Sequence, residues 1–376
     1  MNLHLVLFFT RGVSLRTWAM MGMLEREIAI YLRLIANGFR VTFVTYGNAG
    51  DLEYATHVGG IEIVCNERDL PLEEYESGLS SLHERSLLDC SLIKTNQIYG
   101  AELALAIARF YKKPFVARCG YMWSKNAGLE KGYDSPEATH ARSVEEKVFA
   151  AANQVMVTTE AMQRDIATRI PAVSPRVAVV PNYVDTDVFR PGISTRDEKT
   201  LLFVGRISPE KNLQSLLEAI LPLQVNLILI GEGRLRSELQ TRFGALDGRV
   251  TWEGNVPNAQ LPHYMNEATA FVLPSLYEGH PKALLEAMAC GTPVLGADSS
   301  GIRELIRHGD NGLLCGPDPA ALRLGIRELL SRPDLRFTLG RNARKFVLDH
   351  YSLDKIAAIE MELLRKVADQ PWDLRC

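Results

Sequence analysis

The 376-residue sequence lacks the features that mark several classes of protein. Its cysteines have no paired spacing, and no zinc-like cluster can be assembled from neighbouring Cys and His residues. We therefore expect reduced thiols in a cytoplasmic protein. The first apolar run, residues 3–9, is too short to span a bilayer and has no basic leader or cleavage site. The six cysteines are Cys65, Cys90, Cys119, Cys290, Cys315 and Cys376.

An excess of positive charge is also missing. The formal net charge is −3, and the first half contains no polybasic run. Such a chain is poorly suited to neutralise nucleic-acid phosphates or to dock strongly on anionic lipid. We expect no nucleic-acid partner, and we leave weak membrane association and the oligomeric state open.

What the sequence does contain is an alternation of short β-branched runs with longer helical patterns. This alternation predicts an α/β protein with parallel, doubly wound sheets. In the first half, strands are predicted at residues 3–9, 41–46, 61–65, 92–95, 115–118, 155–158 and 177–180. In the second half, they are predicted at residues 201–204, 227–230, 250–252, 270–273, 293–296 and 312–315.

The length and a break in the pattern predict two domains. The pattern restarts after Pro191, where residues 192–199 are polar and lack apolar periodicity. We therefore expect domains at residues 1–191 and 192–350, each Rossmann-like. Residues 351–376 follow as a helix that we expect to pack back across the domain junction. Its predicted apolar face consists of Leu353, Ile356, Ile359, Leu363 and Val367.

The first chemical motif follows the strand predicted at 201–204. Gly205 and Arg206 open a turn, and Lys211 comes shortly before a helix. Two cations at the carboxyl end of a strand are suited to hold a diphosphate. The alternative is a pair of solvated surface cations.

The second motif contains two glutamates separated by seven residues, Glu278 and Glu286. Pro281 suits the first turn of a helix and Gly291 its end. One carboxylate can then face a sugar from the loop while the other faces a ribose beside the helix. The N–H groups at the helix start would point at phosphates. Alternatively, Glu286 only favours an N-terminal turn through the helix dipole.

A third string, Pro181-Asn182-Tyr183-Val184-Asp185-Thr186-Asp187-Val188-Phe189, closes the first half. It contains an Asp-x-Asp triplet, and paired carboxylates can hold Mg²⁺ or Mn²⁺. The triplet lies beyond the last strand of the first domain, so we interpret it as a turn with local backbone hydrogen bonds.

These three strings together resemble those of retaining glycosyltransferase family 4, which has the GT-B fold. Gly231-Glu232-Gly233 and the stretch from Gly301 to Gly312 are similar to it as well. The resemblance covers most of residues 145–350. It implies two Rossmann-like doubly wound domains that face each other across a cleft, with the acceptor bound by the first and the nucleotide sugar by the second.

The resemblance also implies roles for individual residues. Arg206 and Lys211 would bind the donor diphosphate and stabilise the departing nucleotide, and Glu278 would contact the transferred sugar. Glu286 would accept hydrogen bonds from both ribose hydroxyls. The predicted catalytic residues are Arg206, Lys211 and Glu278. The predicted donor-binding residues are Gly12, Gly205, Arg206, Lys211, Gly231, Asn255, Val256, Glu278, Gly279, His280, Pro281, Lys282, Leu285 and Glu286.

The first half departs from the family pattern. The family's usual His after the fifth strand is replaced by the string Arg118-Cys119-Gly120-Tyr121-Met122-Trp123. His140 lies downstream, where a lone His is more often a surface or core residue. The aromatic residues Tyr121, Trp123 and Tyr133, with Met122, are either a sugar platform or core.

The favoured function is therefore sugar transfer, with retention, from a nucleotide-diphosphate sugar to an acceptor hydroxyl. UDP is the favoured nucleotide, and no metal or cofactor is expected. The acceptor is a carbohydrate, a lipid-linked molecule or a small molecule. A nicotinamide-dependent oxidoreductase would need Gly-x-Gly-x-x-Gly after a first strand, which neither half provides. A glycan- or nucleotide-binding protein with weak or lost turnover is the alternative.

Overall fold

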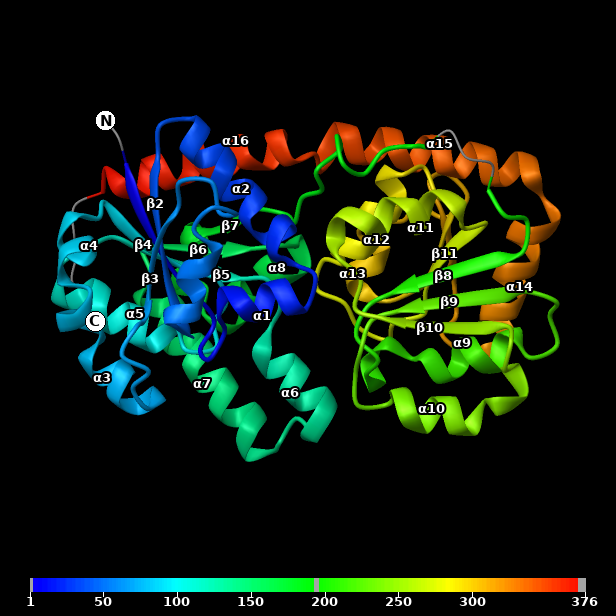
Figure 1. Cartoon of the computed structure of the whole chain (residues 1–376), viewed down its shortest axis with the longest axis horizontal. Coiled ribbons are helices and arrows are strands. Elements are labelled where there is room, and N and C mark those ends of the chain that lie inside the picture. The colour runs from blue at the N-terminus through cyan, green and yellow to red at the C-terminus, as the bar shows by residue number, and fades with distance from the viewer. Residues whose placement is uncertain (1–2, 193–195, 371–376) are drawn as a thin grey trace. The chain divides into compact units, whose positions relative to one another are not determined.

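The computed structural model describes residues 3–192 and 196–370. It contains two compact units. The first comprises Met1–Pro181 together with Asp354–Cys376, and the second comprises Asn182–Leu353. In each unit, helices lie on both faces of one parallel sheet (Figure 1).

The sheet of the first unit has seven strands in the order β3-β2-β1-β4-β5-β6-β7, all parallel. The chain builds outward from β1 to β3 and then returns to the other side of β1 with β4. The strands are β1 (His4–Phe8), β2 (Arg40–Asn48), β3 (Glu62–Asn66), β4 (Leu92–Thr95), β5 (Phe115–Cys119), β6 (Gln154–Val157) and β7 (Val177–Val179).

Helices cover both faces of this sheet. One face packs on α3, α4, α5, α7 and α8 through a single apolar cluster that includes Phe8, Ile93 and Val155. The helical segments of this unit are α1 (Leu15–Met20), α2 (Leu24–Ala36), η1 (Ala49–Tyr54), α3 (Leu72–Leu82), α4 (Glu84–Asp89), α5 (Ala101–Phe110), α6 (Trp123–Lys131), α7 (Pro136–Ala151), α8 (Glu160–Arg169), η2 (Pro171–Arg176) and α16 (Leu353–Ala368).

The C-terminal helix α16 joins the first unit through a buried ion pair. Lys94 of β4 donates to Glu360 of α16, and both side chains are almost fully buried. Lys94 Nζ also lies 3.4 Å from the hydroxyl of Tyr31 in α2. The predicted apolar face of α16 is wrong at Ile359, whose residue surface is 46% exposed. The buried face instead includes Glu360, because its charge is met by Lys94.

The sheet of the second unit has six strands in the order β10-β9-β8-β11-β12-β13, again all parallel. Its strands are β8 (Thr200–Val204), β9 (Asn226–Ile230), β10 (Val250–Gly254), β11 (Ala270–Leu273), β12 (Val294–Ala297) and β13 (Leu313–Cys315). Its helical segments are η3 (Pro209–Lys211), α9 (Leu213–Ile220), α10 (Arg236–Arg242), η4 (Gly244–Leu246), η5 (Asn258–Gln260), α11 (Leu261–Glu267), α12 (Lys282–Ala289), α13 (Ser300–Arg303), α14 (Pro319–Ser331) and α15 (Pro333–His350).

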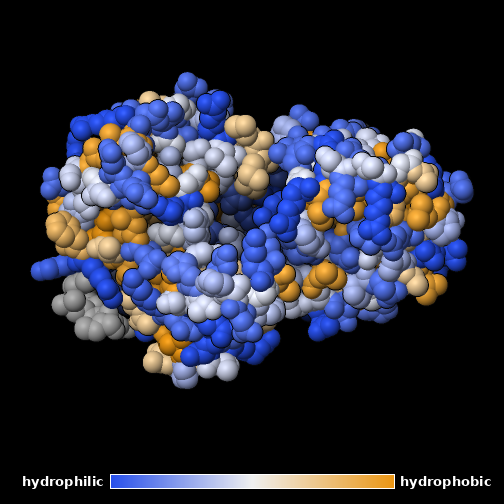
Figure 2. All heavy atoms as spheres, turned by 90° about the horizontal axis from the view of Figure 1, so that it is seen from below, coloured by the Kyte–Doolittle hydropathy of each residue, from blue (hydrophilic) through white to orange (hydrophobic). Residues whose placement is uncertain are grey.

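The predicted strands are all present, which confirms two doubly wound α/β domains. Along the sequence, the chain passes from the first unit to the second between Pro181 and Asn182, and it returns between Leu353 and Asp354. No helix among the described residues is long and apolar enough to cross a membrane. Figure 2 shows one face of the molecule, on which hydrophilic residues predominate and apolar residues form separate patches.

Candidate functional site

The strand order of the second unit reverses between β8 and β11. In open α/β sheets, ligands bind outside the carboxyl ends of the strands at such a switch point. The two loops that follow these strands are bonded to each other here. Leu276 N donates to Glu210 O at 2.9 Å, and Asn212 Nδ2 donates to Pro274 O at 3.1 Å. Both sequence motifs therefore converge on one place in the fold.

Lys211 and Glu278 form a direct ion pair at this switch point. Lys211 Nζ lies 2.6 Å from Glu278 Oε1, and the two side chains are 15% and 10% exposed. The sequence motifs assigned these residues to different parts of a ligand. The structure brings them together, so each neutralises the other where a ligand would bind.

Arg206 extends from the same turn and is 66% exposed. Its Nη2 lies 3.6 Å from Glu210 Oε1, which also accepts a hydrogen bond of 2.6 Å from Ser208 Oγ. Burial raises the pKa of Glu210. The bonds from Ser208 and the backbone, with the charges of Arg206 and Lys211, outweigh that effect and hold its pKa below the usual value. Glu210 is thus a carboxylate that pairs with Arg206 and is stabilised by the charge of Lys211, and the sequence motif does not single it out.

Glycines allow the loops after β8, β9 and β10 to pack closely. Gly231 has φ +132°, and a Cβ there would lie 2.1 Å from Gly205 O. Gly231 N also donates to Gly254 O at 2.6 Å. A Cβ on Gly233 would lie 2.3 Å from Ile207 O. The predicted donor-binding residues Gly205 and Gly231 are therefore in backbone contact.

The segment predicted to meet the nucleotide base follows β10. Asn255 is exposed, whereas Val256 is half-buried and packs against the core of the second unit. Because Gly231 and Gly254 form a β-bridge, this segment begins beside the loop after β9. A base placed here would meet backbone groups and the exposed Asn255 side chain.

Helix α12 begins directly after the Glu278 loop. Pro281 is its N-cap residue, and Gly291, with φ +65°, follows its end. Glu286 is almost fully buried, and its Oε1 accepts a hydrogen bond of 3.0 Å from Asn258 Nδ2. Asn258 was not identified from the sequence, because it is 28 positions from Glu286 and no sequence pattern signals the contact.

The remaining predicted residues of α12 and its loop differ in accessibility. His280 is buried, its ring lies 5.2 Å from that of Tyr351, and its carbonyl accepts from Asn182 Nδ2 at 2.6 Å. Lys282 Nζ lies 5.7 Å from the ring centroid of Tyr183. Leu285 is fully buried in the core, and its amide donates to Pro281 O. Of these three residues, His280 and Leu285 are buried and Lys282 is half-buried.

Gly301 in the short helix α13 supports the Glu278 loop. A Cβ at Gly301 would lie 2.2 Å from Gly279 O and 2.5 Å from Glu278 O. Any larger residue would therefore push on the backbone that carries Glu278. Gly12 of the first unit differs, because its φ is +76° and a Cβ on it would have no neighbouring atom within 4 Å. Its conformation, and not crowding, favours glycine there.

The Asp-x-Asp triplet forms a turn. Asp185 Oδ1 accepts from the amides of Asp187 and Val188, at 3.1 and 3.4 Å. Thr186 O accepts from Arg344. Among residues 3–192 and 196–370, no cluster of three or more His, Cys, Asp or Glu side chains is arranged to hold a metal ion.

The string that replaces the family's usual His contains a buried thiol. Cys119 is fully buried, and burial raises the pKa of its thiol well above the usual value. Met122 is buried too, whereas Tyr121 and Trp123 are half-buried. Tyr133 is exposed, and its ring packs over Gly128, where a Cβ would lie 2.4 Å from it. The cysteine thiol is therefore not a substitute for a ligand-binding imidazole.

The chain matches two family models along most of its length. The model for "Glycosyltransferase Family 4" matches residues 28–188, and the model for "Glycosyl transferases group 1" matches residues 185–346. A D-inositol 3-phosphate glycosyltransferase of Frankia alni is 31% identical over 288 residues, which are 69% of this chain and 70% of that protein. An alpha-maltose-1-phosphate synthase of Mycolicibacterium smegmatis is 30% identical over 60% of this chain and 66% of that protein.

Solved structures share the fold. Sucrose-phosphate synthase from Thermosynechococcus elongatus has a TM-score of 0.79 at 21% identity and covers 97% of this chain and 99% of its own. Anabaena Alr3699/HepE in complex with UDP-glucose has a TM-score of 0.75 at 19% identity, over 96% of this chain and 99% of its own. Together with the two doubly wound units, these matches show that the chain is a GT-B protein and belongs to glycosyltransferase family 4.

Proposed function

We propose that the protein transfers a sugar from a nucleotide-diphosphate sugar to an acceptor hydroxyl, with retention at the anomeric carbon. The observation that carries this proposal is the convergence of Arg206, the Lys211–Glu278 ion pair and the start of α12 at the switch point of the second unit. A diphosphate needs positive charge and N–H donors, and this place offers both.

The departing nucleotide carries the charge that develops during transfer. In this proposal, Lys211 leaves Glu278 to contact the diphosphate, Arg206 closes over it from the surface, and the first amides of α12 point toward it. Such preorganised groups stabilise the transition state more than the ground state. Glu278, released from Lys211, accepts hydrogen bonds from hydroxyls of the transferred sugar.

The nucleoside is bound further along the same edge of the sheet. Glu286 accepts hydrogen bonds from both ribose hydroxyls, and the amide of Asn258 holds its carboxylate in place. The base meets Asn255 and Val256 beside Gly231. UDP is the proposed nucleotide. The likeness to Anabaena Alr3699/HepE, whose structures contain UDP and UDP-glucose, supports that choice.

Retention is proposed through a front-face route. The bond between the anomeric carbon and the phosphate oxygen breaks as the acceptor oxygen bonds to the same face, and the acceptor proton passes to the leaving phosphate. This route needs no protein nucleophile. It needs no divalent metal either, because two cations and a helix start already face the diphosphate.

The chemical class of the acceptor is a polyhydroxylated small molecule or glycan. Two relatives are named for phosphorylated products or substrates, an inositol 3-phosphate and a maltose 1-phosphate. Phosphorylated polyols and sugar phosphates therefore belong beside neutral sugars and lipid-linked sugars among the acceptors to test.

A weakly active or inactive binding protein is the second candidate. The buried Cys119 in the string that replaces the usual His favours it. Such a protein would bind nucleotide through Glu286 and Lys211 and release none from a nucleotide sugar.

The test is release of nucleoside diphosphate by the full chain from UDP-, GDP- and ADP-sugars, with each class of acceptor. Acceptor-dependent release of UDP is expected, with the anomeric configuration of the product equal to that of the donor by NMR. Stabilisation by UDP provides a binding readout, since a ligand at about 100 times Kd adds roughly 2.7 kcal/mol. Binding of UDP without release from any sugar would favour the inactive protein, and stabilisation by GDP alone would reverse the choice of base.

A further inference from the structure

The first unit has a switch point of its own. Its strand order reverses between β1 and β4, and the loops that follow these strands are in contact. Arg11 N donates to Tyr99 O at 3.2 Å. Gly100, with φ +84°, lies so close that a Cβ on it would be 2.5 Å from Arg11 Cβ. The rule that places a ligand between β8 and β11 in the second unit therefore places a second one here.

Two polar side chains converge at this edge, where β4 and β5 end. Gln97 Oε1 accepts from Gly120 N at 2.9 Å, which fixes the orientation of the Gln97 amide. Arg118 Nη1 lies 3.4 Å from Asn96 O. A Cβ on Gly120 would lie 2.8 Å from Gln97 Nε2 and 3.1 Å from Arg118 Nη1. Gly120 thus allows an amide and a guanidinium to approach the same point.

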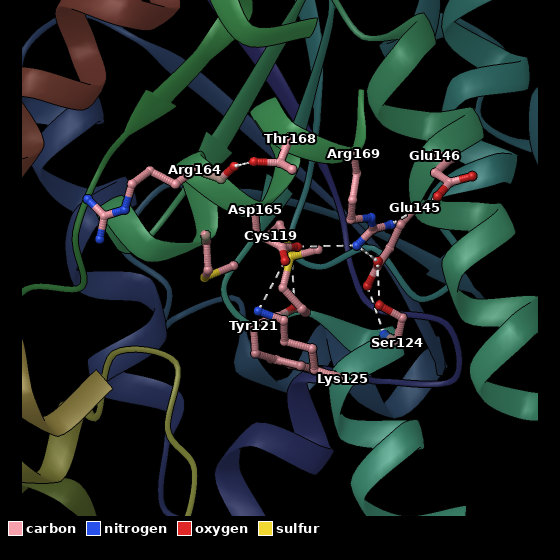
Figure 3. Close-up of polar contacts among 12 residues, drawn as sticks. Cys119, Tyr121, Ser124, Lys125, Glu145, Glu146, Arg164, Asp165, Thr168 and Arg169 are labelled. Atoms are coloured by element: carbon pink, nitrogen blue, oxygen red, sulfur yellow. Dashed lines mark hydrogen bonds and ion pairs between the residues drawn. The ribbon is translucent and has the colours of Figure 1, made fainter. Parts of the chain in front are cut away.

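The segment after this glycine is held by a buried carboxylate that pairs with a half-buried arginine (Figure 3). Glu145 of α7 is fully buried, and its carboxylate accepts from Ser124 N at 2.8 Å and from Ser124 Oγ at 2.7 Å. Arg169 of α8 donates to the same carboxylate at 2.9 Å. The first turn of α6 is therefore fixed to the two helices behind it.

The loop itself is held at two further points. Thr158 Oγ1 donates to Gly120 O at 3.1 Å, and the Cys119 thiol donates to Tyr121 O at 3.1 Å. Figure 3 shows Cys119 and Tyr121 beside the Glu145 network. These contacts hold the backbone of Gly120, to which the Gln97 amide is bonded, in one geometry, as a binding site requires.

Aromatic rings border the same edge. Tyr99, 38% exposed, follows Gln97 by two residues, and its ring centroid lies 5.0 Å from that of Trp123 in an edge-on arrangement. Aromatic surfaces pack well against the C–H faces of sugars and polyols. The edge therefore combines polar donors with an apolar wall.

We propose that Gln97 and Arg118 are the specificity-determining pair that binds hydroxyl oxygens of a polyhydroxylated acceptor, with Gly120 making room for both. This inference rests on the proposed transfer function. Amide and guanidinium N–H groups donate to hydroxyl oxygens. Because both residues belong to the first unit, their loss changes acceptor binding and leaves nucleotide binding in the second unit intact.

The test compares Gln97→Leu, Arg118→Lys and Gly120→Ala with the wild-type chain. Each should raise the acceptor KM by about 10-fold or more, the size expected when a hydrogen bond within a binding site is lost. The Kd of UDP by calorimetry should stay within about twofold of wild type, because UDP binds the second unit. Gly78→Ala, at a helical position where the nearest atom to a Cβ lies 3.5 Å away, is the matched control and should change nothing.

An acceptor KM unchanged in folded Gln97→Leu and Arg118→Lys proteins would overturn the inference while leaving the transfer function standing. A loss of UDP affinity as large as the rise in acceptor KM would also overturn the inference, because the effect would then not be confined to acceptor binding. If Gly120→Ala fails to fold, Gln97→Leu and Arg118→Lys decide, since both keep most of the side-chain volume. Failure of the wild-type chain to release nucleotide from any donor would instead contradict the proposed function itself.

Discussion

Gly301→Ala should impair transfer more than it impairs folding. The added Cβ would lie 2.2 Å from Gly279 O, whereas real Cβ contacts are essentially never shorter than 3.0 Å. The Gly279 carbonyl must therefore retreat by at least 0.8 Å, the difference between these two distances. Gly301 does not have a positive φ, so alanine fits its own backbone conformation. The strain falls on the loop that carries Glu278.

The size of the effect follows from that displacement. Overpacking of a tight site costs about 1–3 kcal/mol of stability, and a shift on the order of 1 Å in a positioning group costs roughly 10²-fold in rate. We expect kcat/KM for the donor to fall by about 10²-fold, with a decrease of a few degrees in Tm. The Kd of UDP should change little, because Glu286 lies in the helix beyond the displaced loop.

The assay is nucleotide release with a saturating acceptor, together with a thermal melt and a UDP titration. Gly244→Ala is the matched control in the same unit, since the nearest atom to its Cβ would be 4.0 Å away. Turnover by Gly301→Ala within about twofold of Gly244→Ala, in a folded protein, would refute the role of the Glu278 loop in positioning the sugar.

Three further predictions concern charge. Lys211→Ala and Arg206→Ala should each lower kcat by about 10²–10³-fold, as expected for groups that face developing charge; turnover close to wild type in either folded variant would contradict this. Initial rates should be the same with and without EDTA, and loss of activity restored by Mg²⁺ or Mn²⁺ would disprove the metal-free route. Burial, followed by the charge of Arg40, lowers the pKa of His4 from 6.5. Below about pH 6.5 the unfolded chain therefore takes up a proton on His4 that the folded chain resists. The free energy of unfolding should decrease as the pH is lowered through this range, and it should decrease less in His4→Gln. Melts at several pH values test this, and an equal fall in His4→Gln would contradict it.

Much of the fold was predictable because each strand is a short apolar, β-branched run with polar or glycine-containing neighbours. The predicted ends differ little from those observed, the C-terminal end of β2 at Asn48 being one of the larger differences. The position of both motifs at the carboxyl ends of strands was also predictable, since residues 205–211 and the loop of Glu278 each follow a predicted strand.

The pairing of charges was not predictable. Lys211 and Glu278 are 67 residues apart, and Lys94 and Glu360 are 266 residues apart. Periodicity describes one element at a time, so it cannot say which distant carboxylate a lysine will meet. For the same reason α16 was assigned an apolar face containing Ile359, although the buried position belongs to Glu360.

The most direct test of the account is a calorimetric titration of UDP into wild type, Glu278→Gln and Glu286→Gln. Glu286→Gln should raise the Kd of UDP by about 10-fold or more, because a charged acceptor of ribose hydrogen bonds is lost. Glu278→Gln should bind UDP as tightly as wild type or more tightly, because Lys211, 2.6 Å from Glu278, is then released for the diphosphate. Loss of UDP affinity in folded Glu278→Gln as large as that in Glu286→Gln would contradict the assignment of one carboxylate to the sugar and the other to the ribose.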